Sequence, residues 1–356
     1  MTTRPRDIEV DRSHGGNLDD GILDFSVSIN PLGPPPEALE AYHRAVSQIG
    51  KYPASYASQL EERIAESLRI DPECVLAGNG TTQLIYLLAR VLKLHAPHVV
   101  IPTFSEIANA LTAASSMPRA IALDAARDFR FEPRAIGAAL ESGADAIFIG
   151  RPNSPTGTSL TFEESALIAQ EASRLGACCV FDEAFLDFAA DDRSMMTIAA
   201  RDPRVIVLRS MTKIFAIPGL RLGYIVSHHV TIRRLRGALE PWSVNIVAEL
   251  VGLACLEAAP EFIARTQTLI AQERDRLTIA LGKNPRVQVI PSLANFLMLR
   301  INDEAEPGEF ARHLLTHQIA IRDLAKLPGA GPGFYRIGLR SVADNNLLLD
   351  AAGTWR

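Results

Sequence analysis

Cysteine is scarce in this chain: four of the 356 residues are cysteines, and no two of them form a C-x-x-C pair. So few cysteines, without metal-ligand spacing, argue against a disulfide framework and against a zinc motif. Cys178 and Cys179 are neighbours inside an apolar run, where we expect reduced residues of a hydrophobic core. The cysteine content therefore favours a protein of the reducing cytoplasm.

Long runs of one charge and long apolar runs are also missing. The formal net charge is −5, and the Lys and Arg residues form no basic patch that would favour a nucleic-acid partner. No apolar stretch approaches the roughly 18 charge-free residues that a membrane span requires. The start of the chain is polar and lacks the apolar segment of a signal peptide. We therefore expect a cytoplasmic protein with neither a membrane nor a nucleic-acid partner.

Strand and helix patterns alternate through most of the chain. Short apolar runs such as 146–149 are typical of strands that are buried on both faces. Their alternation with helical segments predicts an α/β fold with a mostly parallel seven-stranded sheet covered by helices on both sides. The expected strands are 75–77, 98–101, 119–122, 146–149, 177–182, 205–210 and 222–226, and the expected helices are 37–50, 58–68, 82–94, 106–115, 133–141 and 162–175.

The length of the chain suggests a large domain with a smaller one beside it. Residues 1–36 have few periodic runs and end in three prolines, so we interpret them as an arm that packs with the small domain. The large domain is expected at 37–245 and a small C-terminal α/β domain at 246–356. Two long helices are expected at 243–257 and 261–281, followed by strands near 287 and at 296–299, 319–322 and 335–339.

A lysine near the middle of the chain stands between two candidate phosphate-binding residues. Lys213 lies three residues after Ser210 and eight residues before Arg221. This spacing suits a lysine that holds an aldehyde cofactor as a Schiff base, while the hydroxyl and the guanidinium bind the phosphate of that cofactor. The Ser-x-x-Lys pattern alone is weak, because a surface lysine can have the same neighbours.

Two further motifs precede this lysine. Asp182 ends an apolar strand pattern, where a carboxylate is costly unless a cation such as a pyridinium nitrogen faces it. A helix-capping role is the alternative for this aspartate. The turn that contains Gly80, Thr81 and Thr82 lies between a strand and a helix, where backbone N–H groups can bind a phosphate. Since ligands collect at the carboxyl ends of parallel strands, we expect the three motifs to converge.

Together these motifs resemble those of the fold-type I pyridoxal-phosphate (PLP) enzymes, which include the aspartate aminotransferases. The likeness runs from about His14 to the C-terminus. Within this group the chain is most similar to the threonine-phosphate decarboxylases of cobamide biosynthesis. The related histidinol-phosphate aminotransferases lack the opening His-Gly-Gly-Asn and usually have tyrosine at the position of Phe185. The segments that carry the resemblance are 14–17, 23–26, 30–33, 182–185, 216–221 and 241–245.

The resemblance implies a role for each matching residue. Lys213 would carry PLP as a Schiff base, Asp182 would protonate the pyridine ring, and Phe104 would stack on it. Tyr52 would reach the cofactor phosphate of the other subunit, so the resemblance implies a homodimer. Core packing for Phe104 and loop anchoring for Tyr52 are the alternatives. The implied phosphate-binding residues are Gly80, Thr81, Thr82, Ser210 and Arg221.

Several departures from the family pattern concern the cofactor and the substrate. Ser154 stands where the family has an asparagine that binds the phenolic oxygen of PLP, and Phe185 replaces a tyrosine. Either Ser154 or Asn153 would then donate to this oxygen, or the Schiff base would titrate differently. Ser28 stands where relatives have asparagine in a segment that faces the substrate, and Thr81 replaces an acid.

Two arginines of the C-terminal part are candidates for substrate binding. Arg322 and Arg336 lie fourteen residues apart and match paired arginines of the family. The planar guanidinium suits both carboxylate and phosphate groups. His14 beside Gly15-Gly16-Asn17 is a further anion-binding candidate, and the role of Arg340 stays open.

The resemblance therefore implies PLP-dependent decarboxylation of an amino-acid O-phosphate, a carboxy-lyase reaction. The specific reaction that the resemblance implies is conversion of L-threonine O-3-phosphate to (R)-1-amino-2-propanol O-2-phosphate in cobalamin biosynthesis. Serine phosphate stays open as a substrate. The main alternative is a PLP-dependent aminotransferase that acts on histidinol phosphate or a related amino acid. A PLP-binding partner protein without turnover is a third alternative, disfavoured because Lys213, Asp182 and Arg221 are all present.

Overall fold

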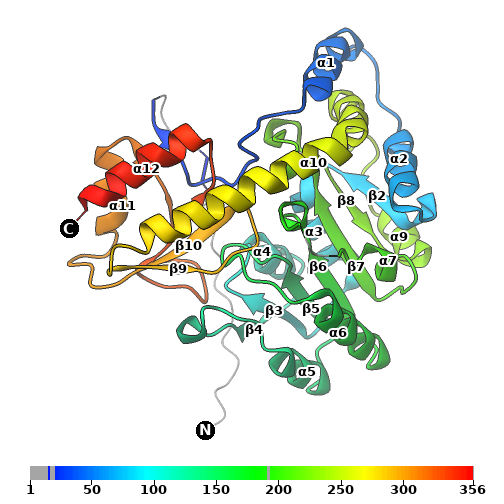
Figure 1. Cartoon of the computed structure of the whole chain (residues 1–356). Coiled ribbons are helices and arrows are strands. Elements are labelled where there is room, and N and C mark those ends of the chain that lie inside the picture. The colour runs from blue at the N-terminus through cyan, green and yellow to red at the C-terminus, as the bar shows by residue number, and fades with distance from the viewer. Residues whose placement is uncertain (1–14, 17–20, 191–192, 356) are drawn as a thin grey trace.

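The centre of the fold is a seven-stranded sheet in the order β2-β8-β7-β6-β5-β3-β4 (Figure 1). The computed structural model describes residues 15–16, 21–190 and 193–355. β8 runs antiparallel to both of its neighbours and the other pairs are parallel, so the prediction of a mostly parallel sheet is confirmed. The strands are β2 (Val75–Gly78), β8 (Gly223–Val226), β7 (Val205–Ser210), β6 (Cys178–Asp182), β5 (Ala146–Gly150), β3 (Pro97–Ile101) and β4 (Arg119–Ala122).

Helices cover both faces of this sheet, because successive strand residues project to opposite sides and both sides are apolar. Cys179 and Phe181 of β6 belong to one hydrophobic core, and Val180 between them belongs to the other. α6 begins with a capping box, in which Thr161 and Glu164 each accept the other's backbone N–H. The helices around the sheet are α2 (Ser58–Leu68), α3 (Gly80–Leu92), α4 (Glu106–Ala113), α5 (Pro133–Glu141), α6 (Phe162–Arg174), α7 (Met196–Ala199), α8 (Met211–Ile214) and α9 (His229–Arg236).

The C-terminal part begins with α10 (Ile246–Leu281), the long helix that crosses Figure 1 from upper right to lower left. It packs against α1 (Pro36–Ala45) and α12 (Val342–Thr354). An antiparallel four-stranded sheet follows it in the order β12-β13-β10-β9. The remaining elements are β9 (Val287–Ile290), β10 (Phe296–Ile301), α11 (Glu309–Thr316), β11 (Ile319–Ala320), β12 (Arg322–Asp323) and β13 (Phe334–Gly338).

The prediction of two helices at 243–257 and 261–281 is wrong, because residues 246–281 form a single helix. The predicted break lay near Pro260, which has no N–H to donate within a helix. The structure holds Pro260 inside α10, with buried Cys255 and Phe262 on either side of it. Tertiary packing of such residues outweighs the loss of one helical hydrogen bond.

Other predicted boundaries also differ from the structure. The segment 319–322 is divided, because β11 pairs with β1 (Leu23–Asp24) whereas β12 pairs with β13. The helix predicted at 37–50 ends at Ala45 and is followed by a 3₁₀ turn, Val46–Gln48. The helices missed were α7, α8, α9, α11 and α12. In α12, three consecutive leucines from Leu347 conceal the helical period.

The N-terminal segment lies against the C-terminal part. β1 pairs in parallel with β11, and the N–H of Gly338 donates to the carbonyl of Phe25 at 2.8 Å. A Cβ on Gly338 would collide with the carbonyl oxygen of Val27, so this backbone crossing requires glycine. The division of the chain at residues 36 and 245 stays a prediction.

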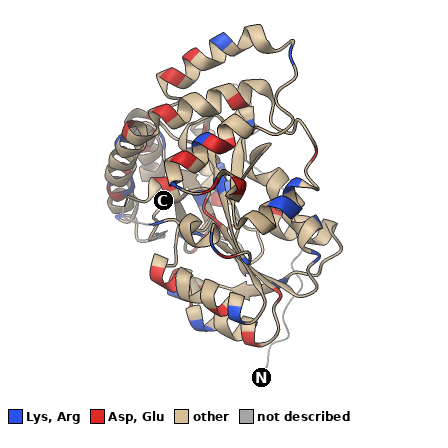
Figure 2. Cartoon of the chain, turned by 90° about the vertical axis from the view of Figure 1, so that its right-hand side faces the viewer, with Lys and Arg blue, Asp and Glu red and all other residues tan. Residues whose placement is uncertain are grey.

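Positions of Lys and Arg and positions of Asp and Glu are interspersed along the helices in the view of Figure 2. This pattern agrees with the small net charge of −5. Within the described ranges, no helix combines the length and the apolar character needed to cross a membrane.

Replacing Gly338 with alanine should destabilise the protein, because the new methyl group would push the N-terminal segment away from β13. We expect the free energy of unfolding to fall by about 1–3 kcal/mol, as for overpacked sites. Urea unfolding followed by circular dichroism measures it. Gly137→Ala is the matched control: Gly137 lies within α5 with no atom near its Cβ position, so alanine should stabilise by about 0.5–1 kcal/mol. Equal effects of the two changes would contradict the prediction.

Candidate active site

A cavity of about 480 Å³ opens where the carboxyl ends of β6 and β7 face β12 and β13. Its walls also include the N-terminal segment, the turn before α3 and the loops that follow β3 and β5. The predicted motifs therefore converge, as expected for the strand ends of a parallel sheet. The predicted site residues that line the cavity are Ser28, Thr81, Thr82, Phe104, Ser154, Asp182, Ser210, Lys213, Arg221, Arg322 and Arg336.

Asp182 and Lys213 both face the cavity, and their pKa values are shifted toward each other. Removal from water raises the pKa of Asp182 to about 6, although the N–H of Ala184, which donates to its carboxylate at 3.1 Å, opposes this shift. Removal from water also lowers the pKa of Lys213 to about 8, and the charges of Arg336 and Arg221 lower it further. A larger neutral fraction of Lys213 results, and the neutral amine is the form that attacks an aldehyde.

The turn before α3 forms a cradle for an anion. α3 begins at Gly80, two residues earlier than predicted, and its first N–H groups have no partner within the helix. Gly80 has a φ of +76°, and a Cβ on it would lie 2.6 Å from Nη2 of Arg221. Glycine thus lets the guanidinium approach the helix start, and the hydroxyl-bearing residues beside it in the cavity are Thr81, Thr82 and Ser210.

Arg336 and Arg322 form the opposite wall, where they are directly paired across β12 and β13. Nη1 of Arg336 donates to Oγ of Ser154 at 3.1 Å, and Nη2 donates to the carbonyl of Ser26 at 2.7 Å. Among the described atoms, Nε of Arg336 is buried without a partner. Burial lowers the pKa of Arg336 to about 10, and the charge of Arg322 lowers it further. An anion bound here would relieve the repulsion between the two guanidinium groups.

Asn153, the alternative to Ser154, is not among the described residues that line the cavity. Its side chain is fully buried, and its amide donates to the Pro102 carbonyl at 2.7 Å and to Thr156 Oγ1 at 3.0 Å. Its oxygen accepts from the Thr103 hydroxyl at 2.9 Å. These bonds hold Asn153 behind the wall, so Ser154 is the one of the two that faces a ligand.

Ser28 offers a polar atom for which the described part of the chain has no partner. Its Oγ is buried and makes no hydrogen bond there, although the residue lines the cavity. A buried hydroxyl without a partner is costly, and a ligand atom would satisfy it. Phe104 and Phe185 add apolar walls, and the ring of Phe185 packs edge-on against Phe296 at 5.0 Å between centroids.

Besides Gly80 and Asn153, which are not among the described lining residues, two predicted site residues are not placed in the cavity by this single chain. Tyr52 is 84% exposed, and its ring lies 5.4 Å from that of Trp242 between centroids. His14 lies outside the described residues, whereas its neighbour Gly15 lines the cavity.

Sequence reasoning missed several lining residues. Thr212 could have been found from the sequence, because it lies inside the Ser-x-x-Lys motif. In the structure its Oγ1 lies 2.7 Å from Oγ of Ser210. Leu324 and Leu327 form an apolar wall between β12 and β13. No motif marks them, since an apolar loop residue looks like any core residue in the sequence.

Comparison with known proteins agrees with this arrangement. The family described as Aminotransferase class I and II matches residues 20–351. The chain belongs to this aminotransferase family. A relative, the threonine-phosphate decarboxylase of Salmonella typhimurium, is 35% identical over 350 residues, which cover 95% of each chain. The chain is also 28% identical to an adenosylcobalamin biosynthesis bifunctional protein of Leptospira interrogans, over 97% of this chain and 40% of the relative.

Solved structures share the fold of this aminotransferase-family chain. L-Threonine-O-3-phosphate decarboxylase from Porphyromonas gingivalis has a TM-score of 0.85 at 23% identity, over 94% of this chain and 99% of the other. Histidinol-phosphate aminotransferase from Clostridium acetobutylicum has a TM-score of 0.86 at 26% identity, over 93% of this chain and 98% of the other. The expected fold of the PLP enzymes is therefore confirmed.

The buried amine of Lys213 should make the stability of the cofactor-free protein depend on pH. Because its folded pKa of about 8 lies below the 10.5 of an ordinary lysine, the unfolded chain binds more protons between these values. The free energy of unfolding should therefore rise from about pH 8 to pH 10.5. Below pH 8 the folded protein carries the full cost of burying the charged amine. Lys213→Met should remove this rise and should increase the free energy of unfolding at pH 7 by up to about 3 kcal/mol.

Unfolding free energies at several pH values between 7 and 10.5 measure this effect. Lys283→Met, which replaces an exposed lysine, is the matched control. A difference between Lys213→Met and the unmodified protein that stays constant above pH 8 would show that Lys213 is not the responsible group.

Proposed function

We propose that this chain is a PLP-dependent carboxy-lyase that converts L-threonine O-3-phosphate to (R)-1-amino-2-propanol O-2-phosphate. The observation that carries the proposal is the pairing of Arg322 and Arg336 in the wall of the cavity that holds Lys213. Two guanidinium groups suit a substrate with two anionic groups, here a carboxylate and a phosphate. The similarity to the Salmonella decarboxylase and to the adenosylcobalamin biosynthesis protein supports this substrate and a role in cobalamin biosynthesis.

The cavity has the donors and charges that PLP requires. The cradle at Gly80, with Thr81, Thr82, Ser210 and Arg221, would bind the cofactor phosphate. Nζ of Lys213 would hold the cofactor covalently, Asp182 would keep a proton on the pyridine nitrogen, and Phe104 would cover the ring. When bound, PLP supplies an electron sink for the negative charge that develops at Cα of the substrate.

Ser154 would serve in place of the missing asparagine. Its Oγ accepts a hydrogen bond from Arg336, which leaves its own proton available for donation into the cavity. The phenolic oxygen of PLP is the acceptor that we propose for this proton. The cationic Arg336 would polarise the hydroxyl and so strengthen its donation.

The remaining residues would decide which bond of the substrate breaks. Arg322 and Arg336 would bind its two anionic groups and so orient the carboxylate for loss. The Cα–carboxylate bond would break with loss of carbon dioxide, and the protonated amine of Lys213 or a nearby acid would donate a proton to Cα in place of the carboxylate. Leu324 and Leu327, both buried, would exclude water from this space.

A PLP-dependent aminotransferase is the second candidate function. The similarity to a histidinol-phosphate aminotransferase structure favours it, and the same cavity residues would hold the same cofactor. Histidinol phosphate carries a phosphate but no carboxylate, so it would use only part of the paired arginines. Production of an amine and carbon dioxide without a keto acid separates the two reactions.

The protein should release carbon dioxide from L-threonine O-3-phosphate without an added keto acid. Arg322→Ala and Arg336→Ala should each lower kcat/KM, with a loss of transition-state stabilisation on the order of 2–5 kcal/mol, because each leaves a substrate charge unpaired. Arg300→Ala is the control, since Arg300 lies on the same sheet but is not among the described cavity residues. Turnover that requires a keto acid, or tighter binding of threonine than of its phosphate, would overturn the assignment.

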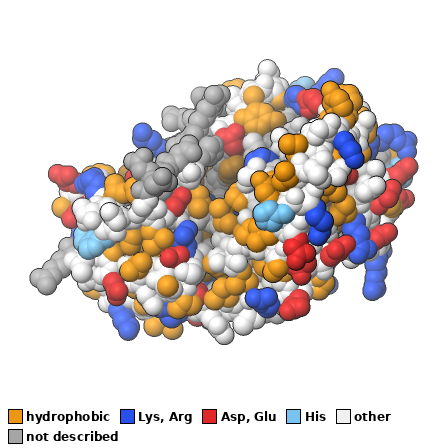
Figure 3. Space-filling model, turned by 90° about the horizontal axis from the view of Figure 1, so that it is seen from above, with side chains coloured by type: hydrophobic (Ala, Val, Ile, Leu, Met, Phe, Trp, Pro, Cys, Tyr) orange, Lys and Arg blue, Asp and Glu red, His pale blue; other side chains and the backbone are white. Residues whose placement is uncertain are grey.

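We also propose that the active form is a homodimer. Large apolar side chains are exposed along α1 and the segment after it, from Leu39 (47%) through Val46 (53%) and Ile49 (70%) to Tyr52 (84%). Hydrophobic side chains are visible over the α1 end of the molecule in Figure 3. Apolar groups in such a row favour a protein interface. The family resemblance would then place Tyr52 at the partner's cofactor phosphate.

The proposal includes a cytoplasmic location. All four cysteines are free, and three of them are buried, namely Cys74, Cys179 and Cys255. Thiols that persist without pairing are typical of reducing compartments.

Ile49→Asp should convert the dimer to monomer and lower activity, because a charge at the interface is costly and Tyr52 would lose its site. Sedimentation velocity at the assay concentration measures the first effect and carbon dioxide release the second. Leu167→Asp, on an exposed residue of α6, should leave both unchanged. A fully active monomer would refute the shared site.

A further inference from the structure

A buried carboxylate that faces away from the cavity lies directly behind it. Glu183 is fully buried, and its carboxylate accepts from Nη1 of Arg151 at 2.9 Å and from Nη1 of Arg209 at 3.3 Å. It also accepts from the N–H of Met195 at 2.9 Å and from the hydroxyl of Ser194. The proposed chemistry uses none of these residues.

The members of this cluster are chain neighbours of cavity residues. Glu183 follows Asp182 at the end of β6, and Arg209 precedes Ser210 at the end of β7. Successive strand residues project to opposite faces. Asp182 and Ser210 therefore line the cavity, whereas their chain neighbours Glu183 and Arg209 pair with each other behind it. Arg151 begins the loop that carries Ser154 into the cavity wall.

Backbone bonds connect the same strand ends. The N–H of Arg151 donates to the carbonyl of Asp182 at 2.8 Å, and the N–H of Glu183 donates to the carbonyl of Leu208 at 2.9 Å. The ends of β5, β6 and β7 are therefore held together both by backbone bonds and by the side chain of Glu183. A change in this side chain would be transmitted to three cavity walls.

The cluster extends to the long helix of the C-terminal part. Arg209 forms an ion pair with Asp187 and is paired directly with Tyr224 across β7 and β8. The burial of Arg209 acts to lower its pKa, but Asp187, Tyr224 and Glu183 raise it overall. Nε2 of Gln267, on α10, donates to the carbonyl of Asp187 at 3.0 Å. Two arginines and two acids balance, so the cluster is electrically neutral.

We infer that Glu183, Arg209 and Arg151 are positioning residues, which hold the ends of β5, β6 and β7 in the arrangement that lets Asp182, Ser210 and Ser154 bind PLP. Burying an ion pair contributes little to stability compared with well-packed apolar residues, so stability alone does not explain four charges here. The need to position three ligand-binding segments explains these four charges. A constellation of this kind must be held to within a fraction of an ångström by the contacts behind it.

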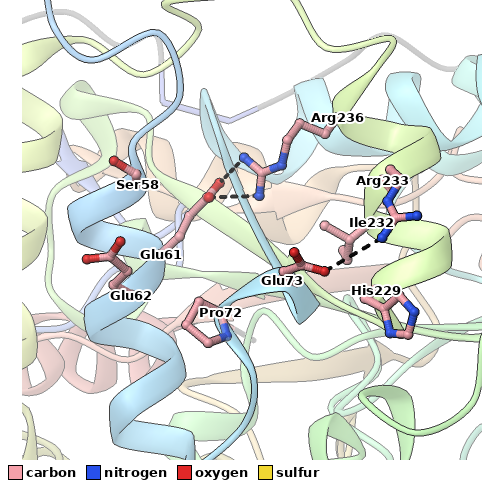
Figure 4. Close-up of a pocket in the computed structure, with 9 residues that line it drawn as sticks. All are labelled: Ser58, Glu61, Glu62, Pro72, Glu73, His229, Ile232, Arg233 and Arg236. Atoms are coloured by element: carbon pink, nitrogen blue, oxygen red, sulfur yellow. Dashed lines mark hydrogen bonds and ion pairs between the residues drawn. The ribbon is translucent and has the colours of Figure 1, made fainter.

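The chain contains a matched pair elsewhere for comparison. Glu61 of α2 is also a buried carboxylate, and it accepts from Nη2 of Arg236 at 2.8 Å and from the N–H of Ala77 at 2.9 Å. Figure 4 shows this pair in a hollow between α2 and α9, beside the more exposed pair of Glu73 and Arg233. Loss of the Glu61 charge should cost stability but should leave the PLP site intact.

The test measures PLP binding by the cofactor-free protein, through absorbance titration, beside its thermal midpoint. Glu183→Gln and Arg209→Lys should each raise the dissociation constant for PLP at least tenfold. Glu61→Gln should change it less than twofold, although its thermal midpoint falls as in Glu183→Gln. The titration needs no amino-acid substrate, so failure of the proposed reaction would not be confused with failure of this inference.

Unaltered PLP affinity in a folded Glu183→Gln or Arg209→Lys protein would overturn the inference. An equal loss of affinity in Glu61→Gln would overturn it as well, because the effect would then be general destabilisation. If neither charge variant folds, Ser194→Ala removes one hydrogen bond to Glu183 without changing a charge. Its PLP affinity must then fall while its thermal midpoint stays close to that of the unmodified protein, and an unchanged affinity rejects the positioning role.

Discussion

The positive charge gathered in one cavity is the constraint on which the rest of the structure depends. The described lining carries four cationic side chains and two carboxylates, those of Asp182 and Glu106. Cations withdrawn from water raise the free energy of the folded state unless anions face them. The lowered pKa values of Lys213 and Arg336 both reflect this cost. Phosphate and carboxylate groups are the ligands that would offset it, so charge balance and proposed function lead to the same chemistry.

The sheet carries two kinds of polar group at its strand ends, one on each side. Asp182 and Ser210 face the cationic cavity, whereas Glu183 and Arg209 belong to a neutral cluster behind it. The two-residue period of a strand makes this separation possible without any change in the backbone. It also means that Asp182 and Ser210 each have a chain neighbour whose own contacts hold the end of the strand. The site is thus supported by side chains that never touch a ligand.

Several features could be predicted from the sequence because they depend on local patterns. Apolar runs of strand length predicted every strand of the seven-stranded sheet to within a residue at each end. Residues directly after those runs, such as Asp182 and Ser210, were expected near a ligand because parallel strands end at one edge. Local patterns failed where packing dominates. α10 continues through Pro260, and the helix α12 lacks a clear period.

The sequence by itself determined the α/β fold, the mostly parallel sheet and the Lys213 motif, since these follow from periodicity and from residue types at short spacing. Only the tertiary structure decided that Ser154 faces the cavity while Asn153 lies behind it, because two neighbours in a turn differ only in side-chain direction. The meeting of Arg322 and Arg336 with Lys213 in one cavity was likewise decided by the tertiary structure. Such contacts join residues more than a hundred positions apart, and no local pattern in the sequence encodes their distance.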